Sequence, residues 1–350
     1  MNKKKVLVAI SGGIDSSITA LILKNGGYEV IGCFLNMHTH NQQAINDAKI
    51  VSEFIGIECI VRDIKKRFLE VVQNNFYNEY RNGRTPNPCV LCNKEIKFKE
   101  LFSLADERGI KLVATGHYAN KIYDEKNGKY ILKKSKDLSK DQSYVLWRLE
   151  QKDLERIMFP LGEYSSKNDV RVLAEEQKLP VFDKKDSQDI CFIPSNDYHS
   201  FIKDYSASIN DKISDGDVLI DGKVIGKHKG IPYYTIGQRR GLGIAYKEPI
   251  YVKRIDIASN TIEVAKLEDT YSNVLVADDY NIISGEKLKE GLYDIKIRYK
   301  SREKLGTAVE HNGRLVVNFN EPISSIALGQ SVVLYDNDTL IGGGVISEVG

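Results

Sequence analysis

Hydroxyl groups, glycines and one carboxylate meet in a short segment near the start of the chain. The apolar run Val6–Ile10 is followed by Ser11-Gly-Gly-Ile-Asp-Ser-Ser17 and then by the apolar-periodic stretch Ile18–Leu23. A strand that breaks at Ser-Gly-Gly and restarts as a helix directs backbone N–H groups and the positive helix end toward one point. This pattern predicts an anion site suited to the pyrophosphate end of a nucleotide. It lacks the Gly-Lys-Ser/Thr of a Walker A loop, and a plain strand-to-helix turn with serine caps is the alternative.

Two cysteines three positions apart form a second group of potentially reactive side chains. Cys89 and Cys92 follow Thr85-Pro-Asn-Pro88, in which two prolines and an asparagine stiffen the loop and fix where side chains point. Cys92 comes directly before the start of an expected helix. A helix N-terminus beside Lys94 and Lys97 should lower the pKa of a thiol and favour the thiolate.

The remaining three cysteines differ in their surroundings. Cys191 follows the polar segment 186–189, whereas Cys33 and Cys59 lie inside apolar strands and are expected to be inert core residues. A Cys-x-x-Cys pair can serve as a redox pair, as half of a zinc site or as part of an iron–sulfur site. Zinc is disfavoured because no histidine stands at close spacing to the pair.

The elements that must position these residues alternate between strand and helix up to about residue 118. Strands are expected at 6–10, 29–35, 57–61 and 111–115, and helices from residue 18 and at 41–55, 64–81 and 95–108. Such alternation predicts an α/β fold with a doubly wound parallel sheet, whose ligands bind at the carboxyl ends of the strands. Ser11, Leu35 and Gly116 all lie at such ends.

The pattern of expected secondary structure changes twice in the remainder of the chain. A hairpin is expected at 118–134 around Asn127-Gly128, followed by helices at 142–158 and 167–177. From about residue 212, short β-rich segments with turn signals predict a small central β domain and then a C-terminal β-barrel, divided near 276–279. We therefore expect domains at 1–200, 201–275 and 276–350.

Composition restricts the class of protein. The net charge is +2, and five cysteines in 350 residues argue against a disulfide framework, so we expect a reducing, cytoplasmic setting. Neither a signal-type segment nor an apolar run of membrane-spanning length is present, so we expect no membrane association. The basic segment 222–240 would suit a phosphate backbone, although such runs are usually solvated faces.

With these pieces assembled, the chain resembles the bacterial tRNA-specific 2-thiouridylase family of the PP-loop ATP pyrophosphatases, whose fold is adenine nucleotide alpha hydrolase-like. These enzymes place sulfur on C2 of the wobble uridine. The resemblance covers essentially the whole chain and rests on seven motifs in the same order: Ser11–Ser16, Gly83–Pro88, Leu91–Phe98, Ala114–Ala119, Lys140–Tyr144, Ile190–Ile193 and Thr235–Gly243.

The resemblance implies an ATP site with Mg²⁺ in the first domain. The matching residues are Ala9, Ile10, Ser11, Gly12, Gly13, Ile14, Asp15, Ser16, Leu35 and Gly116. Asp15 would help to hold the metal or the loop, and a helix N-cap is its plainer alternative.

The resemblance also implies that Cys92 is the nucleophile-type cysteine and that Cys191 carries the incoming persulfide sulfur. ATP would adenylate the C2 oxygen, and a separate protein would donate the sulfur. Cys92 would then release the sulfur by forming a disulfide with Cys191. Residues matching segments that meet the target base or the tRNA are Asn87, Pro88, Cys89, His117, Lys140, Asp141, Gln142, Arg298, Tyr299 and Gln330.

One departure from the family pattern leaves the mechanism open. Many members have aspartate where this chain has Cys89, so a carboxylate role at that position is in doubt. Together Cys89, Cys92 and Cys191 could instead ligate a [4Fe–4S] cluster with one open iron, although four thiolates are usual. A thiol at position 89 could also pack under the Pro-Asn-Pro turn. At the level of function, a PP-loop amidating synthetase and a non-catalytic RNA-binding adaptor are the rival hypotheses.

Overall fold

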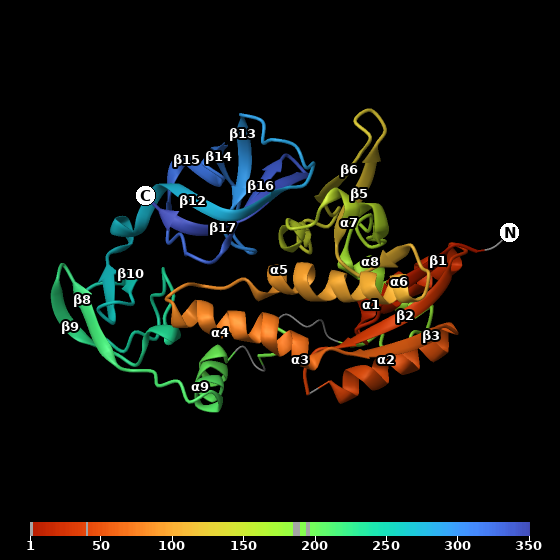
Figure 1. The fold of residues 1–350 in the computed structure, drawn as a ribbon, viewed down its shortest axis with the longest axis horizontal. Coiled ribbons are helices and arrows are strands. Elements are labelled where there is room, and N and C mark those ends of the chain that lie inside the picture. The colour runs from red at the N-terminus through yellow and green to blue at the C-terminus, as the bar shows by residue number, and fades with distance from the viewer. Residues whose placement is uncertain (1–2, 40, 185–189, 194–196) are drawn as a thin grey trace.

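The computed structural model describes residues 3–39, 41–184, 190–193 and 197–350 (Figure 1). The polar segment 186–189 that precedes Cys191 lies outside the described residues.

The first sheet contains five parallel strands in the order β3-β2-β1-β4-β7. Their bounds are Glu58–Asp63 (β3), Glu29–Asn36 (β2), Lys5–Ala9 (β1), Leu112–Ala114 (β4) and Ile157–Met158 (β7). Because every pairing is parallel, the carboxyl ends of β1, β2 and β4 meet at one edge of the sheet.

Helices cover both faces of this sheet, and β1 shows how the sequence arranges it. Val6 and Val8 pack with α1, α2 and α8, whereas Leu7 packs on the opposite side with the helices that follow β3. A strand buried on both faces requires the continuous apolar run that the sequence has. The doubly wound α/β fold is therefore confirmed. The helices that pack against Val6 and Val8 are Ile14–Asn25 (α1), Gln42–Ile55 (α2) and Lys167–Glu176 (α8).

Two long helices lie side by side across the other face, as Figure 1 shows for the orange segments. The first comprises Lys65–Phe68 (α3), the π-helical turn Leu69–Gln73 (η1) and Asn74–Arg81 (α4). The second comprises Pro88–Cys92 (α5), the π-helical turn Asn93–Phe98 (η2) and Lys99–Glu107 (α6).

The start of the second long helix corrects a sequence expectation. The helix expected from residue 95 begins at Pro88, because proline lacks an N–H and has a φ suited to the first helical position. Cys92 therefore lies one turn inside the helix and not at its N-terminus.

The helix expected over residues 142–158 is also wrong. The chain forms a 3₁₀ turn at Ser143–Leu146 (η3), a short helix at Gln151–Arg156 (α7) and then β7. Ile157 is extended and pairs with Val113 at the open edge of β4. Strand β4 provides hydrogen-bond partners for the backbone of residues 157–158, and the helical periodicity of the local sequence does not indicate this pairing.

The C-terminal part contains a closed barrel. Strand β12 pairs with both β15 and β17, so the six strands β12-β15-β14-β13-β16-β17 form a ring. The bounds are Tyr271–Ile282 (β12), Leu292–Lys296 (β13), Lys304–His311 (β14), Arg314–Ser324 (β15), Ser331–Asp336 (β16) and Thr339–Val349 (β17). The division expected at 275/276 falls within β12.

Two smaller β units complete the described chain. The predicted hairpin is present as Ala119–Asp124 (β5) and Lys129–Lys134 (β6), and β6 joins β17 through Thr339 and Lys133. A four-stranded central sheet has the order β10-β11-β8-β9 and follows the helix Tyr198–Ser208 (α9). Its strands are Gly216–Ile220 (β8), Lys223–His228 (β9), Tyr251–Asp256 (β10) and Thr261–Ala265 (β11).

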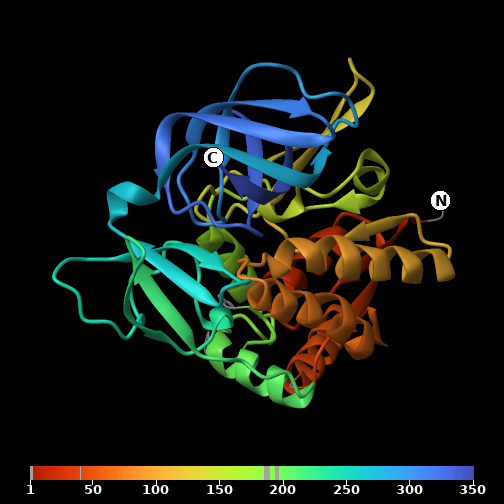
Figure 2. The same cartoon turned by 60° about the vertical axis from the view of Figure 1, so that its left-hand side comes forward.

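Figure 2 shows the barrel above the long helices, with the central sheet beside them. Within the described ranges, no helix combines the length and apolar character needed to cross a bilayer.

Candidate functional site

The loop after β1 is compact and depends on Gly12. Its φ is +73°, and a Cβ there would lie 2.6 Å from the carbonyl oxygen of Ala44, so only glycine fits. Inside the loop, the Ser11 N–H donates to Oγ of Ser16 at 3.0 Å, and Ser16 Oγ lies 3.1 Å from the Gly13 carbonyl. The N-cap of α1 is Gly13, which has no capping side chain. A turn with serine caps is therefore not what the loop adopts.

Asp15 lies in the first turn of α1, so its interpretation as an N-cap is wrong. Its Oδ1 accepts a hydrogen bond from the Tyr118 hydroxyl at 2.7 Å and forms an ion pair with the buried ammonium of Lys167. Lys167 is the first residue of α8, which Ser166 and Asp169 cap reciprocally. The capping pattern could have located this helix start, but not the partner of Lys167.

The other predicted nucleotide residues lie around the same loop. Ala9 ends β1, and the Ile10 N–H bonds the carbonyl of Cys33 at 2.8 Å. A Cβ on Gly116 would lie 3.0 Å from the amide nitrogen of Ser16, so the end of β4 touches the loop. Leu35 is buried near the end of β2, and Ile14 is buried at the start of α1.

A second lysine that the sequence did not single out contacts the loop. The Lys184 ammonium donates to the carbonyl oxygen of Gly12 at 2.8 Å and pairs with Asp47. Lys167 and Lys184 thus bring two cations to the loop from segments more than 150 residues away.

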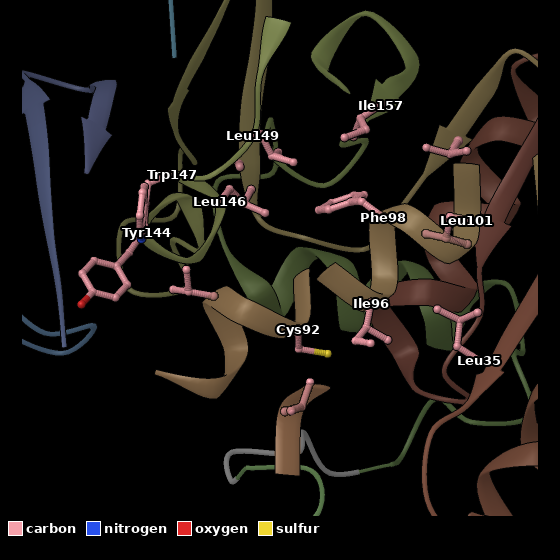
Figure 3. Close-up of a cluster of buried hydrophobic side chains, with 14 of the residues drawn as sticks. Leu35, Cys92, Ile96, Phe98, Leu101, Tyr144, Leu146, Trp147, Leu149 and Ile157 are labelled. Carbon is pink, nitrogen blue, oxygen red and sulfur yellow. The ribbon is translucent and has the colours of Figure 1, made fainter. Parts of the chain in front are cut away.

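Cys92 is buried, and burial raises the pKa of its thiol to about 12, with Lys97 acting in the opposite direction. The expected lowering of this pKa is wrong for two reasons. Cys92 is not at a helix N-terminus, and Lys94 is held by Glu150 at 2.7 Å and by Asp153 at 2.8 Å. Figure 3 shows Cys92 on the helix that carries Ile96, Phe98 and Leu101 into the buried cluster.

Cys89 and Cys191 are exposed, and all five cysteines are free thiols. Partial desolvation raises the pKa of the Cys191 thiol, and Lys97 again opposes the rise. The next residue, Phe192, anchors this segment, because its ring lies 5.6 Å from Phe68 and 5.3 Å from Phe76. The three thiols interact electrostatically with one another and with Lys97.

This arrangement does not fit an iron–sulfur cluster. In the part of the chain that the structure describes, which includes all three thiols, no group of three or more His, Cys, Asp or Glu side chains is placed to hold a metal. We therefore derive no step through a cluster. Cys33 is fully buried in β2, and Cys59 is half-buried in β3, as expected for core positions.

Most of the predicted tRNA-contacting residues meet where the barrel touches the first domain. The Tyr299 hydroxyl donates to the Asp141 carbonyl at 3.1 Å, and the Gln330 amide donates to the carbonyls of Thr85 and Pro86. Arg298 donates to the Ser325 carbonyl. The segments 87–89 and 140–142 therefore lie beside the barrel.

Two of these candidates have partners inside the protein. The Asp141 carboxylate is buried and accepts from the Ser135 N–H at 3.0 Å and the Ser143 hydroxyl at 2.7 Å. Gln142 Oε1 accepts from the Tyr118 N–H at 3.0 Å. Lys140 is half-buried in the same segment.

His117 lies apart from the barrel contacts, next to Gly116 at the sheet edge. Its Nδ1 is 2.8 Å from the Thr115 hydroxyl, and its ring lies 6.0 Å from that of Phe98. Burial, helped by the charge of Lys97, lowers the pKa of His117 to about 3. The imidazole is therefore neutral at physiological pH.

Three family models match consecutive parts of the chain. They are described as a tRNA methyl transferase HUP domain (residues 4–195), a tRNA methyl transferase PRC-barrel domain (199–266) and an Aminomethyltransferase beta-barrel domain (272–346).

Curated relatives match over nearly the full length. The chain is 46% identical over 360 residues to tRNA-specific 2-thiouridylase MnmA 2 of Thermoanaerobacter sp. (strain X514), covering 98% of each chain. It is 43% identical over 364 residues to tRNA-specific 2-thiouridylase MnmA of Natranaerobius thermophilus, covering 99% of this chain and 98% of that one. Among solved structures, the U34-tRNA thiolase NcsA from Methanococcus maripaludis aligns at 20% identity over 60% of this chain and 67% of that one. Its TM-score of 0.36 is too low to support an argument.

Proposed function

This chain belongs to the tRNA-specific 2-thiouridylase family, and we propose that it replaces the C2 oxygen of the wobble uridine in tRNA with sulfur, using ATP. The observation that carries the proposal is the Ser11–Ser16 loop at the carboxyl edge of the sheet, in a chain that also has an exposed Cys191 and a buried Cys92. Two family descriptions use the word methyl transferase, whereas the full-length relatives are named thiouridylases, and full-length similarity bears more directly on the reaction.

In the first step, the uridine C2 oxygen attacks the α-phosphorus of ATP. The bond from that phosphorus to the oxygen bridging to the β-phosphate breaks, and pyrophosphate leaves with the electron pair. The N–H groups around Gly12 and Gly13 and the start of α1 would bind the departing phosphates. The ammonium groups of Lys167 and Lys184, which pair with Asp15 and Asp47 in the free protein, would lie beside these phosphates. AMP on the C2 oxygen turns that oxygen into a leaving group.

A magnesium ion usually binds through the phosphates of the nucleotide and one or two carboxylates. Asp15 fits this role, because both of its described bonds use Oδ1 and the carboxylate has a second oxygen. When bound, the ion would neutralise phosphate charge.

In the second step, the terminal sulfur of a persulfide on Cys191 attacks C2, and AMP leaves with the former C2 oxygen. The Cys92 thiolate then attacks the Sγ atom of Cys191. The bond from that Sγ to the transferred sulfur breaks, and the transferred sulfur keeps the electron pair as the C2 thione. The two thiols are oxidised to a disulfide, which a cellular dithiol must reduce before the next turnover.

The exposure of the two cysteines suits these separate roles. Cys191 is exposed, so a persulfide-carrying donor protein can reach it. Cys92 is buried and its raised pKa keeps it protonated in the resting protein, so its thiol must lose a proton before it attacks Cys191. We also propose that the protein is located in the cytoplasm, where tRNA and reducing conditions are found. For the division of the chain into domains, we propose the limits 1–200, 201–275 and 276–350.

Pyrophosphate release and nucleoside analysis test the function. The protein should release pyrophosphate from ATP faster when unmodified tRNA is added, and nuclease digestion of that tRNA should yield 2-thiouridine when a persulfide donor is present. An amidating synthetase would respond to a small acceptor and not to tRNA. An RNA-binding adaptor would release no pyrophosphate at all, and either result would overturn the proposal.

A further inference from the structure

The pairing of arginine side chains singles out one place on the surface. The chain has fourteen arginines, and all but Arg239, Arg240 and Arg302 have an interaction partner within the protein. Over the described ranges, these three side chains have no hydrogen bond, ion pair or aromatic contact, and all three are exposed. A guanidinium group is always charged and its N–H groups match the oxygens of a phosphate. The three together therefore form a candidate anion site.

Arg239 and Arg240 lie in a turn whose shape is fixed by hydrogen bonds. The Oε1 atom of Gln238 accepts from the Thr235 N–H at 3.0 Å, and its Nε2 donates to the carbonyl oxygen of Arg240 at 3.0 Å. The turn is also joined to the start of β10, because the Val252 N–H donates to the Gln238 carbonyl at 3.0 Å. The backbone that carries the two arginines is thus held in place without a ligand.

Arg302 lies in the loop between β13 and β14, which also has internal hydrogen bonds. The Ser301 hydroxyl donates to the Arg298 carbonyl at 2.9 Å, so the chain turns immediately before Arg302. The adjacent carboxylate, Glu303, pairs with Lys134 at 2.7 Å. The nearest acid in the sequence therefore leaves the charge of Arg302 uncompensated.

The turn of the central sheet touches the barrel at Gly237 and Ser325. The φ of Gly237 is +82°, and a Cβ there would lie 2.4 Å from the Cβ of Ser325, so only glycine permits this approach. The Arg298 guanidinium donates to the Ser325 carbonyl at the same place. Arg239 follows Gly237 by two residues. Arg302 follows Arg298 by four, so its backbone lies within about 15 Å of that residue.

The neighbourhood of these loops indicates which polyanion they would bind. The barrel loop that carries Arg302 also carries Tyr299, whose hydroxyl donates to the Asp141 carbonyl at 3.1 Å. Both of those residues match family segments that meet tRNA. An RNA strand offers a regular series of phosphate groups, and arginine can bind phosphate oxygens through two parallel hydrogen bonds. Unpaired arginines on two adjoining loops suit such a strand.

We propose that Arg239, Arg240 and Arg302 bind phosphate groups of the tRNA backbone outside the target base, so that the central sheet and the barrel hold the substrate together. This inference rests on the proposed function, which supplies the tRNA. It gives the central sheet a role in substrate binding and none in the chemistry at C2.

The salt dependence of tRNA binding tests the proposal. Each phosphate contact that is lost should reduce the steepness of log K against log salt concentration by about 0.7–0.9. Arg239→Gln, Arg240→Gln and Arg302→Gln should each show this reduction between about 50 and 200 mM KCl, with a Kd raised roughly fivefold at about 0.1 M. The triple variant should raise the Kd roughly a hundredfold and reduce the steepness by about 2–3.

Two kinds of control separate phosphate binding from damage to the fold. Lysine at the same three positions keeps the charge and should retain the steepness of the wild type. Arg108→Gln should change neither the Kd nor its salt dependence, since Arg108 is an exposed arginine of the first domain that pairs with Glu58 at 3.3 Å. Thermal unfolding checks that every variant is folded.

Kinetics give a second readout. A saturating concentration of tRNA should restore the wild-type rate of pyrophosphate release in the glutamine variants, because the three arginines touch no reacting atom. A triple variant whose Kd and salt dependence equal those of the wild type would overturn the inference. A raised Kd with unchanged salt dependence would also overturn it, because the lost contacts would not be to phosphate. Binding is measured without ATP or a sulfur donor, so it decides the inference even if the protein forms no 2-thiouridine.

Discussion

Cys92 and Lys97 lie five residues apart across a π-helical turn, and the charge of Lys97 opposes the rise that burial imposes on the pKa of the Cys92 thiol. An α-helical turn would place Ile96 above Cys92, whereas an i→i+5 turn brings Lys97 closer to that face. Lys97 acts on Cys191 in the same direction. One lysine therefore influences both thiols that the proposed sulfur transfer uses.

Replacing Lys97 with methionine should raise the pKa of both thiols, because a nearby cation that favours the thiolates is lost. Alkylation by iodoacetamide, followed for each cysteine by mass spectrometry, should shift to higher pH in Lys97→Met and less in Lys97→Arg. Lys99→Met is the control, since Lys99 is exposed on the same helix and pairs with Glu95. Identical pH midpoints in Lys97→Met and the wild type would refute this role.

Asp15→Ala and Ser16→Ala should each abolish AMP formation and leave tRNA binding within about threefold, because both residues belong to the loop proposed to bind phosphate. Rapid-quench measurement of AMP from labelled ATP, with filter binding of tRNA, separates the two effects. Asp106→Ala controls for loss of a surface carboxylate, since Asp106 pairs with Arg156 on the far end of α6. Normal AMP formation by either loop variant would disprove the nucleotide assignment.

Cys92→Ser and Cys191→Ser should each abolish thiolation, whereas Cys33→Ser and Cys59→Ser should retain it. Serine at position 33 puts a hydroxyl into a fully buried site and should cost about 1–3 kcal/mol of stability, without changing the chemistry. Thiolated tRNA, measured by liquid chromatography and mass spectrometry, distinguishes these variants. Product from Cys191→Ser would exclude the persulfide role of that residue.

Cys89→Ala should retain measurable thiolation with aerobically purified enzyme and a persulfide donor, because neither sulfur donation nor release uses that thiol. Its exposed position in the first turn of α5 also predicts little loss of stability. Iron and sulfide analysis after anaerobic purification is the parallel measurement. A brown, iron-containing wild type beside an inactive, iron-free Cys89→Ala would show that a cluster operates instead.

The protein should lose stability in acid partly through His117. Its pKa is lowered to about 3 by burial, whereas the unfolded chain binds the proton near the ordinary value of about 6.5. The contribution is therefore fully present above pH 6.5 and is lost as the pH falls toward 3. Between pH 7 and pH 5 this linkage amounts to about 2 kcal/mol.

Urea unfolding of wild type and His117→Gln at the two pH values checks this prediction. The wild type should lose about 2 kcal/mol more than the variant, because glutamine does not titrate. Equal losses would mean that His117 can be protonated in the folded protein.

Local patterns were sufficient to predict the sheet and the position of the Ser11–Ser16 loop. The apolar run Val6–Ile10 and the turn at Gly12 depend only on residues within about ten positions of one another. A loop between a strand and the helix that follows it lies at the edge of the sheet, whatever the order of the other strands. The order of β and α segments similarly indicated the β-barrel at the end of the chain, but not that β12 and β17 would close it.

The environment of each reactive group was decided by tertiary contacts. The sequence around Cys92 suggested an activated thiol, yet packing buried it and drew Lys94 toward Glu150 and Asp153. The cation beside Asp15 comes from a helix 152 residues later, and the donors to the Thr85 loop come from the barrel 244 or more residues later. Burial and ion pairing depend on which segments meet in space, and sequence neighbours do not determine that.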